Sequence, residues 1–143
     1  MNKLTWETVL NKFGSCSGAF EHYAAHFPDG SVVEIETVVK KLREFGDDED
    51  ALWMALNCLN ENGKKAYVFF MGGLSTPENR RHYMVVDGCK DAANDIGISR
   101  TASWIVEAVL SGARTDRQRR AIFNKAIDFV LKLLESDENC LEV

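Results

Sequence analysis

Apolar residues recur along this chain at the spacing of α-helices, in stretches bounded by polar residues. Within residues 32–45, Ile35, Val38, Val39 and Leu42 follow the i, i+3, i+4, i+7 pattern of one helix face. The longest stretch, residues 116–136, repeats this pattern, and its predicted buried residues are Phe123, Ala126, Ile127, Val130, Leu131 and Leu134. The same reasoning predicts eight helices, at residues 6–13, 16–27, 32–45, 47–59, 64–74, 77–96, 100–111 and 116–136.

Residues typical of helix ends fall between these stretches. Ser31 followed by Glu34, and Thr115 followed by Gln118, match the capping box, in which two side chains satisfy the free amides of a helix start. Pro77 follows Thr76 and suits a first helical turn. Glycines that can end a helix in the left-handed conformation follow five of the stretches: Gly14, Gly46, Gly63, Gly97 and Gly112.

Segment 64–74 is the one stretch where a strand competes with a helix. Its centre, residues 67–70, is rich in β-branched and aromatic residues, but no second run offers a convincing strand partner. We therefore predict a helix that buries Ala66, Phe69, Phe70 and Leu74. The fold expected overall is all-α: one domain spanning residues 1–143, built as a compact bundle of seven or eight antiparallel helices, with a short acidic tail from about residue 137.

Composition agrees with a soluble globular protein. Of the 143 residues, 45% are hydrophobic and 27% are charged, which is ordinary for such proteins. No apolar run is long enough to cross a bilayer, and the first residues lack the apolar segment of a secretory signal. We expect a cytoplasmic protein.

The residues that usually carry chemistry do not assemble into a motif, and we predict no catalytic, cofactor or metal site. The four cysteines lie far apart, without the spacing of a zinc site; Cys58 and Cys89 fit apolar helix faces, and Cys140 is expected to be exposed in the tail. His22 and His26 are four residues apart, but Tyr23 stands where a metalloprotease helix needs glutamate. Cys16 lies near a helix start, where it serves more simply as a capping candidate.

Charge is distributed unevenly along the chain, whose net charge is −5. Acidic residues lie at the start of the fourth predicted helix. Several arginines lie at the starts of two other predicted helices, where their charge opposes the positive end of the helix dipole. The acidic run is explained by capping, or it contacts a basic partner. The arginines pair within the molecule or are solvated, or they form an anion-binding patch. The candidate partner-binding residues are Asp47, Asp48, Glu49, Asp50, Arg80, Arg81, Arg114, Arg117, Arg119 and Arg120.

The tryptophans would anchor an interface if they were exposed. Trp104 lies between predicted core positions, so we expect it to be buried. Trp53 lies beside the predicted stripe of Leu52, and we expect it at the edge of the core.

The segment Cys16-Ser17-Gly18-Ala19, together with residues 44–55, Glu-Phe-Gly-Asp-Asp-Glu-Asp-Ala-Leu-Trp-Met-Ala, resembles small helix-rich proteins of phages and mobile elements. Some members of that group are described as immunity proteins. The similarity covers about a third of the chain, and its motifs are structural. The chain lacks a second tryptophan near Trp53 and the alanine-rich C-terminal repeats, so no functional residue is carried over.

These observations predict a non-enzymatic protein-binding inhibitor or immunity-type protein of a bacterial or phage conflict system, acting through a charged helical surface. Its partner would be another protein, a host enzyme or a toxin, and it would be a monomer or a homodimer. Two alternatives stay open: a small helical enzyme, such as a nuclease or hydrolase, and a helical nucleic-acid-binding protein. The acidic net charge disfavours nucleic acid, whose binding depends on neutralised phosphates.

Overall fold

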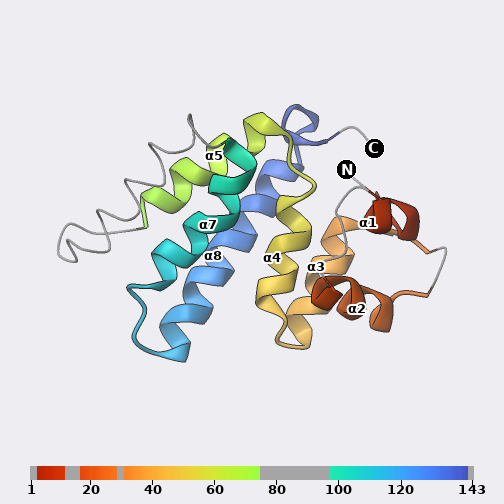
Figure 1. The fold of residues 1–143 in the computed structure, drawn as a ribbon, viewed down its shortest axis with the longest axis horizontal. Helices are drawn as coiled ribbons and strands as arrows, with labels where there is room; N and C mark the ends of the chain where they lie inside the picture. The colour runs from red at the N-terminus through yellow and green to blue at the C-terminus, as the bar shows by residue number, and fades with distance from the viewer. Residues whose placement is uncertain (1–2, 12–16, 29–30, 75–96, 142–143) are drawn as a thin grey trace.

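The computed structural model describes residues 3–11, 17–28, 31–74 and 97–141, and in this part of the chain seven α-helices pack together (Figure 1). Two short strands in the same part form a small antiparallel sheet. The all-α prediction is confirmed. The sixth predicted helix, residues 77–96 with Arg80 and Arg81, lies outside the described residues. The described elements are β1 (Lys3–Thr5), α1 (Trp6–Asn11), α2 (Ser17–His26), β2 (Val32–Glu34), α3 (Ile35–Glu44), α4 (Asp48–Leu56), α5 (Glu61–Gly72), α7 (Ile98–Leu110), α8 (Asp116–Leu134) and the 3-10 helix η1 (Asp137–Asn139).

Helix α4 lies in the middle of the bundle, between α3 on one side and α8 on the other, and α5 packs mainly against α7 (Figure 1). The predicted stripe of α3 is confirmed, because all four of its apolar residues are buried. The stripe of α8 is confirmed except at Leu131, which is only partly buried. These two helices therefore cover the two sides of α4 with the faces that their sequences predict.

The capping box predicted at Ser31 is wrong. Residues 32–34 form strand β2, which pairs antiparallel with β1, so that Leu4 lies opposite Val33. Helix α3 begins only at Ile35, and Glu34 precedes it without a capping side-chain hydrogen bond. Ser31 Oγ instead donates to the Pro28 carbonyl. Pairing with a segment thirty residues away thus replaces a local capping motif, and it places Leu4, which is fully buried, over the core.

Helix α5 begins three residues before the predicted start, and its buried face differs from the predicted one. Asn60 caps it by accepting a hydrogen bond from the Gly63 amide at 3.0 Å, so Gly63 lies in the first turn and does not end α4. The segment is a helix, as predicted. The side chains that it buries come from Tyr67, Val68 and Met71, whereas the exposed fraction of the Phe69 side chain is 77%.

Of the other predicted helix ends, those at Gly46 and Thr115 are confirmed. Gly46 follows α3 with φ +78°, the left-handed conformation that favours glycine. Thr115 and Gln118 form a complete capping box at the start of α8. Gly97 also has positive φ, but it stands at the start of α7. Gly112 does not adopt the left-handed conformation, and Gly14 lies outside the described residues.

The acidic C-terminal segment packs against the bundle. Its η1 helix leads into a bridge between Leu59 and Cys140, and the Leu141 amide donates to the Cys58 carbonyl at 2.9 Å. Cys140 is therefore partly buried, contrary to the prediction that it is exposed. Among the described helices, none combines the length and apolar character needed to cross a membrane.

Candidate functional site

Four arginines surround the start of α8, and together we call them the arginine patch: Arg114, Arg117, Arg119 and Arg120. The capping box fixes this helix start, because Gln118 Oε1 accepts hydrogen bonds from the amides of Arg114 and Thr115 at 2.6 and 3.1 Å. All four arginines are exposed. In the part of the chain that the structure describes, none of their guanidinium groups lies within ion-pair distance of a carboxylate.

The acidic run lies at the start of α4. Asp47 occupies the N-cap position, but its side chain does not accept a capping hydrogen bond. Asp48, Glu49 and Asp50 lie in the first turn, where the helix dipole stabilises negative charge. Helix electrostatics thus favours the acidic residues in this first turn, whereas it works against the arginine patch.

The two predicted clusters lie at the same end of the bundle. Helices α4 and α8 pack together, and their N-terminal ends both lie at the lower edge of the view in Figure 1, next to the C-terminal end of α7. No ion pair between described residues joins the acidic run to the arginine patch. Arg80 and Arg81, the other predicted partner-binding residues, lie outside the described residues.

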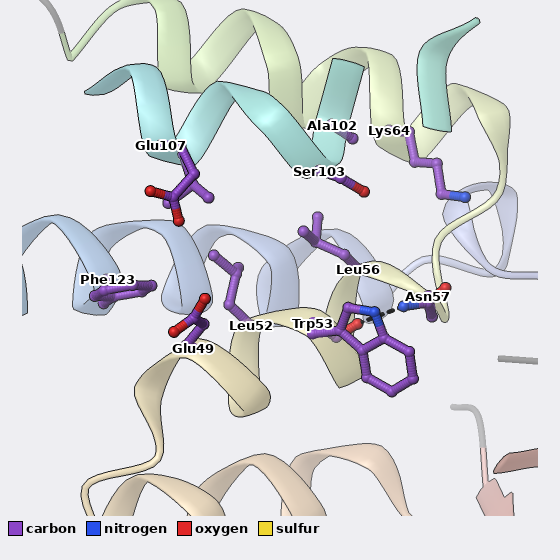
Figure 2. Close-up of a pocket in the computed structure, with 11 residues that line it drawn as sticks. Glu49, Leu52, Trp53, Leu56, Asn57, Lys64, Ala102, Ser103, Glu107 and Phe123 are labelled. Atoms are coloured by element: carbon purple, nitrogen blue, oxygen red, sulfur yellow. Dashed lines mark hydrogen bonds between the residues drawn. The ribbon is translucent and has the colours of Figure 1, made fainter. Parts of the chain in front are cut away.

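A cleft that sequence reasoning missed opens between α4 and α7. It has a volume of about 160 Å³, and Figure 2 shows the side chains that line it. Leu52 and Leu56 of α4, Val106 of α7 and Phe123 of α8 give it apolar walls. Four helices contribute to it, so only the tertiary arrangement defines it.

Charged groups of opposite sign line the two ends of this cleft. At one end, the carboxylates of Glu49 and Glu107 face each other across the gap between α4 and α7 (Figure 2). At the other end lie Lys64 and Asn57. The side-chain amide of Asn57 donates a hydrogen bond to the Trp53 carbonyl at 2.8 Å. Partial burial lowers the pKa of the Lys64 ammonium group. The cleft therefore combines an acidic end, an apolar middle and a basic end.

Two described cysteines and one described histidine lie outside the cleft. Burial, together with the nearby Cys140, raises the pKa of the Cys58 thiol to about 12, and burial also raises the pKa of Cys140. A thiol is nucleophilic as its thiolate, so neither cysteine is activated. His26 stacks on Phe45 with ring centroids 4.4 Å apart. The described residues contain no group of three or more His, Cys, Asp or Glu side chains that could hold a metal ion.

The tryptophans differ from one another in exposure. Trp104 is 52% exposed, with the Arg100 guanidinium over its ring, so the prediction that it is buried is wrong. Trp53 lies partly buried at the wall of the cleft, as predicted for the edge of the core. Trp6 donates its indole N–H to the Pro28 carbonyl and packs edge-on against Tyr23.

Comparison with known proteins adds no relative. No protein-family model, no curated protein and no solved structure matches this chain significantly.

Proposed function

We propose that this protein is a non-enzymatic binding protein that uses the arginine patch to attach to a carboxylate-rich surface of another protein and block it. An immunity-type or inhibitory role in a bacterial or phage conflict system fits this mode of action. It also agrees with the resemblance of residues 16–19 and 44–55 to phage and mobile-element proteins.

The observation that carries the proposal is that none of the four arginines at the start of α8 forms an ion pair with a described residue. Each cation there opposes the dipole of α8, which lowers the stability of the helix by about 0.3–1 kcal/mol. No ion pair of the described residues offsets it. Residues that weaken a local element without a compensating contact are expected at functional sites. Guanidinium groups bind carboxylates through paired, charge-assisted hydrogen bonds, so an acidic protein surface suits this patch.

A protein partner explains the patch better than nucleic acid does. Sequence-independent binding to nucleic acid depends on a broad positive field, whereas the chain has a net charge of −5 and carries Asp47–Asp50 at the same end as the patch. Such mixed charge instead allows a complementary surface to be selected and oriented.

The test compares the wild type with the triple variant Arg117→Gln/Arg119→Gln/Arg120→Gln and with Lys125→Gln, an exposed control on the same helix. Affinity capture from the native host should retain one protein on the wild type and on the control, and lose it on the triple variant. With that protein purified, the association rate should fall about tenfold in the triple variant, and the wild-type rate should fall as salt increases.

The same variant provides a signature that a structural role would not produce. Because the arginines oppose the helix dipole, the triple variant should melt at the same temperature as the wild type or slightly higher while losing its partner. Lower stability with unchanged capture would contradict the proposal. Loss of the captured material after nuclease treatment would replace it with nucleic-acid binding.

A further inference from the structure

The cleft between α4 and α7 has the size of a site for one long side chain. Its volume of about 160 Å³ is close to the roughly 150 Å³ of an apolar cavity that accepts a single benzene molecule. It is partly open to solvent. A ligand therefore fits lengthwise, with one of its ends able to continue out into solvent.

The order of groups along the cleft defines the order of groups in its ligand. The carboxylates of Glu49, in the first turn of α4, and Glu107, near the last turn of α7, face each other, and two carboxylates side by side favour a cation. The apolar middle accepts a hydrocarbon stem. The ammonium group of Lys64 at the far end favours an anion.

We propose that this cleft binds the carboxy-terminal lysine or arginine of a partner protein. The terminal carboxylate would lie at Lys64, and the side-chain stem would lie along Leu52 and Val106. The cationic head would lie between Glu49 and Glu107. The inference deepens the proposed function, on which it rests for the existence of a protein partner, by specifying the end of the partner chain that is recognised.

The length of the cleft along α4 is comparable to the length of this ligand. Glu49 in α4 and Asn57 at its C-cap mark the two ends of the cleft, and their backbone positions are eight residues, or about 12 Å, apart along the helix axis. An extended lysine places its carboxylate and ammonium six bonds apart, about 7 Å. Charge-assisted hydrogen bonds of about 2.8 Å at each end bring the total to about 13 Å.

The basic end of the cleft selects a chain terminus over a free amino acid. A free lysine would bring its α-ammonium group next to Lys64, and the two cations would repel each other. In a peptide the same nitrogen is a neutral amide. An internal lysine of a partner would place no carboxylate at Lys64, so it would leave the basic end unused.

Calorimetric titration with short acetylated peptides tests the proposal on the whole chain. A peptide ending in lysine with a free carboxylate should bind at least tenfold more tightly than the same peptide with a C-terminal amide. Free lysine and a peptide ending in norleucine should also bind more weakly. Nuclear magnetic resonance should show a shift of the Trp53 indole signal, with the Trp6 signal unchanged as an internal reference.

Matched variants identify the groups responsible. Glu107→Gln and Glu49→Gln should each weaken the lysine peptide about fivefold or more, whereas Glu21→Gln, an exposed control on α2, should not. Lys64→Met should remove the difference between the acid and amide peptides, and Lys125→Met should leave that difference in place.

Equal affinity for the acid and amide peptides would overturn the inference, because the basic end would then play no part. The lack of any binding at about 10 mM peptide would also overturn the inference, because a binding free energy of only a few kcal/mol is detectable at that concentration. Neither result affects the proposed function, which is tested through the arginine patch and needs no occupied cleft.

Discussion

Single residues decide how closely the C-terminal segment approaches the bundle, and Gly63 shows this most directly. A β-carbon at this position would lie 2.8 Å from the Asn139 carbonyl oxygen and 2.8 Å from Leu59 Cδ2. The carbonyl belongs to backbone that is hydrogen-bonded to the Asn60 amide at 2.8 Å, so it cannot easily move away. The glycine is needed for close packing, and its role differs from the helix-ending role that the sequence suggested.

Replacing Gly63 with alanine should therefore lower the free energy of unfolding by about 1–3 kcal/mol, the range for forcing extra atoms into a packed site. Urea denaturation followed by circular dichroism measures this loss. Gly73→Ala serves as the control, because its β-carbon would come no closer than 3.3 Å to another atom and its backbone is helical. Equal stability of the two variants would contradict the close approach.

The buried face of α5 illustrates what residue patterns cannot resolve. Residues 66–71 are all apolar or aromatic, so several faces of the helix satisfy the periodicity equally well. The sequence indicated Phe69, but the core takes up its neighbours Val68 and Met71. The neighbouring helices determine which face of α5 is buried, and the sequence of the segment itself does not specify where those helices lie.

At the scale of elements, local signals succeed where no distant segment competes with them. The Thr115 capping box forms as predicted, and no strand among the described residues pairs with residues 114–118. The equivalent signal at Ser31 is overridden by strand pairing with residues 3–5. The sequence of β1 is too short and irregular to predict a strand. The replacement of the Ser31 capping box by strand pairing could therefore not be predicted.

Thr115→Ala should cost about 1 kcal/mol in the free energy of unfolding, because it removes the acceptor of the Gln118 amide hydrogen bond at 3.1 Å. Thermal and urea denaturation measure the change. Thr37→Ala, at an exposed position inside α3, is the matched control and should change stability by less than about 0.5 kcal/mol. A loss confined to the control position would refute the importance of the cap.

At the scale of the whole molecule, the arrangement of helices creates the cleft. Its lining residues are ordinary members of four separate helical patterns, spread from Glu49 to Phe123. The edge position of Trp53 was the one local hint. The acidic run and the arginine patch were visible in the sequence, but their location at one end of the bundle follows from how α4 and α8 pack.

Alkaline stability is a whole-molecule property that the buried Cys58 should influence. Its thiol has a pKa of about 12 in the folded chain, against a reference of 9.0 when exposed. Below pH 9 the thiol is protonated in both states, so its contribution is complete. Between pH 9 and 12 only the unfolded chain loses the proton, and the free energy of unfolding falls by about 1.4 kcal/mol per pH unit.

The check compares urea denaturation at pH 8 and pH 10.5 for the wild type and Cys58→Ala. The wild type should lose about 2 kcal/mol more than the variant between these two pH values. The comparison cancels the contribution of Tyr67, whose pKa is also raised by burial. Parallel losses in both proteins would show that Cys58 is accessible to water.

The packing of α8 against α4, and the bridge from Cys140 back to Leu59, have a consequence for biosynthesis. While the chain leaves the ribosome, α4 emerges long before the helix that covers one of its sides. Apolar residues of α4 that are buried in the folded protein, including Leu52 and Ala55, therefore stay uncovered on that side until about eighty more residues have been translated. During that interval nascent chains are vulnerable to aggregation. Slowing translation across residues 60–110 should increase the dependence of this protein on chaperones, and co-expression of a holdase chaperone should restore its yield.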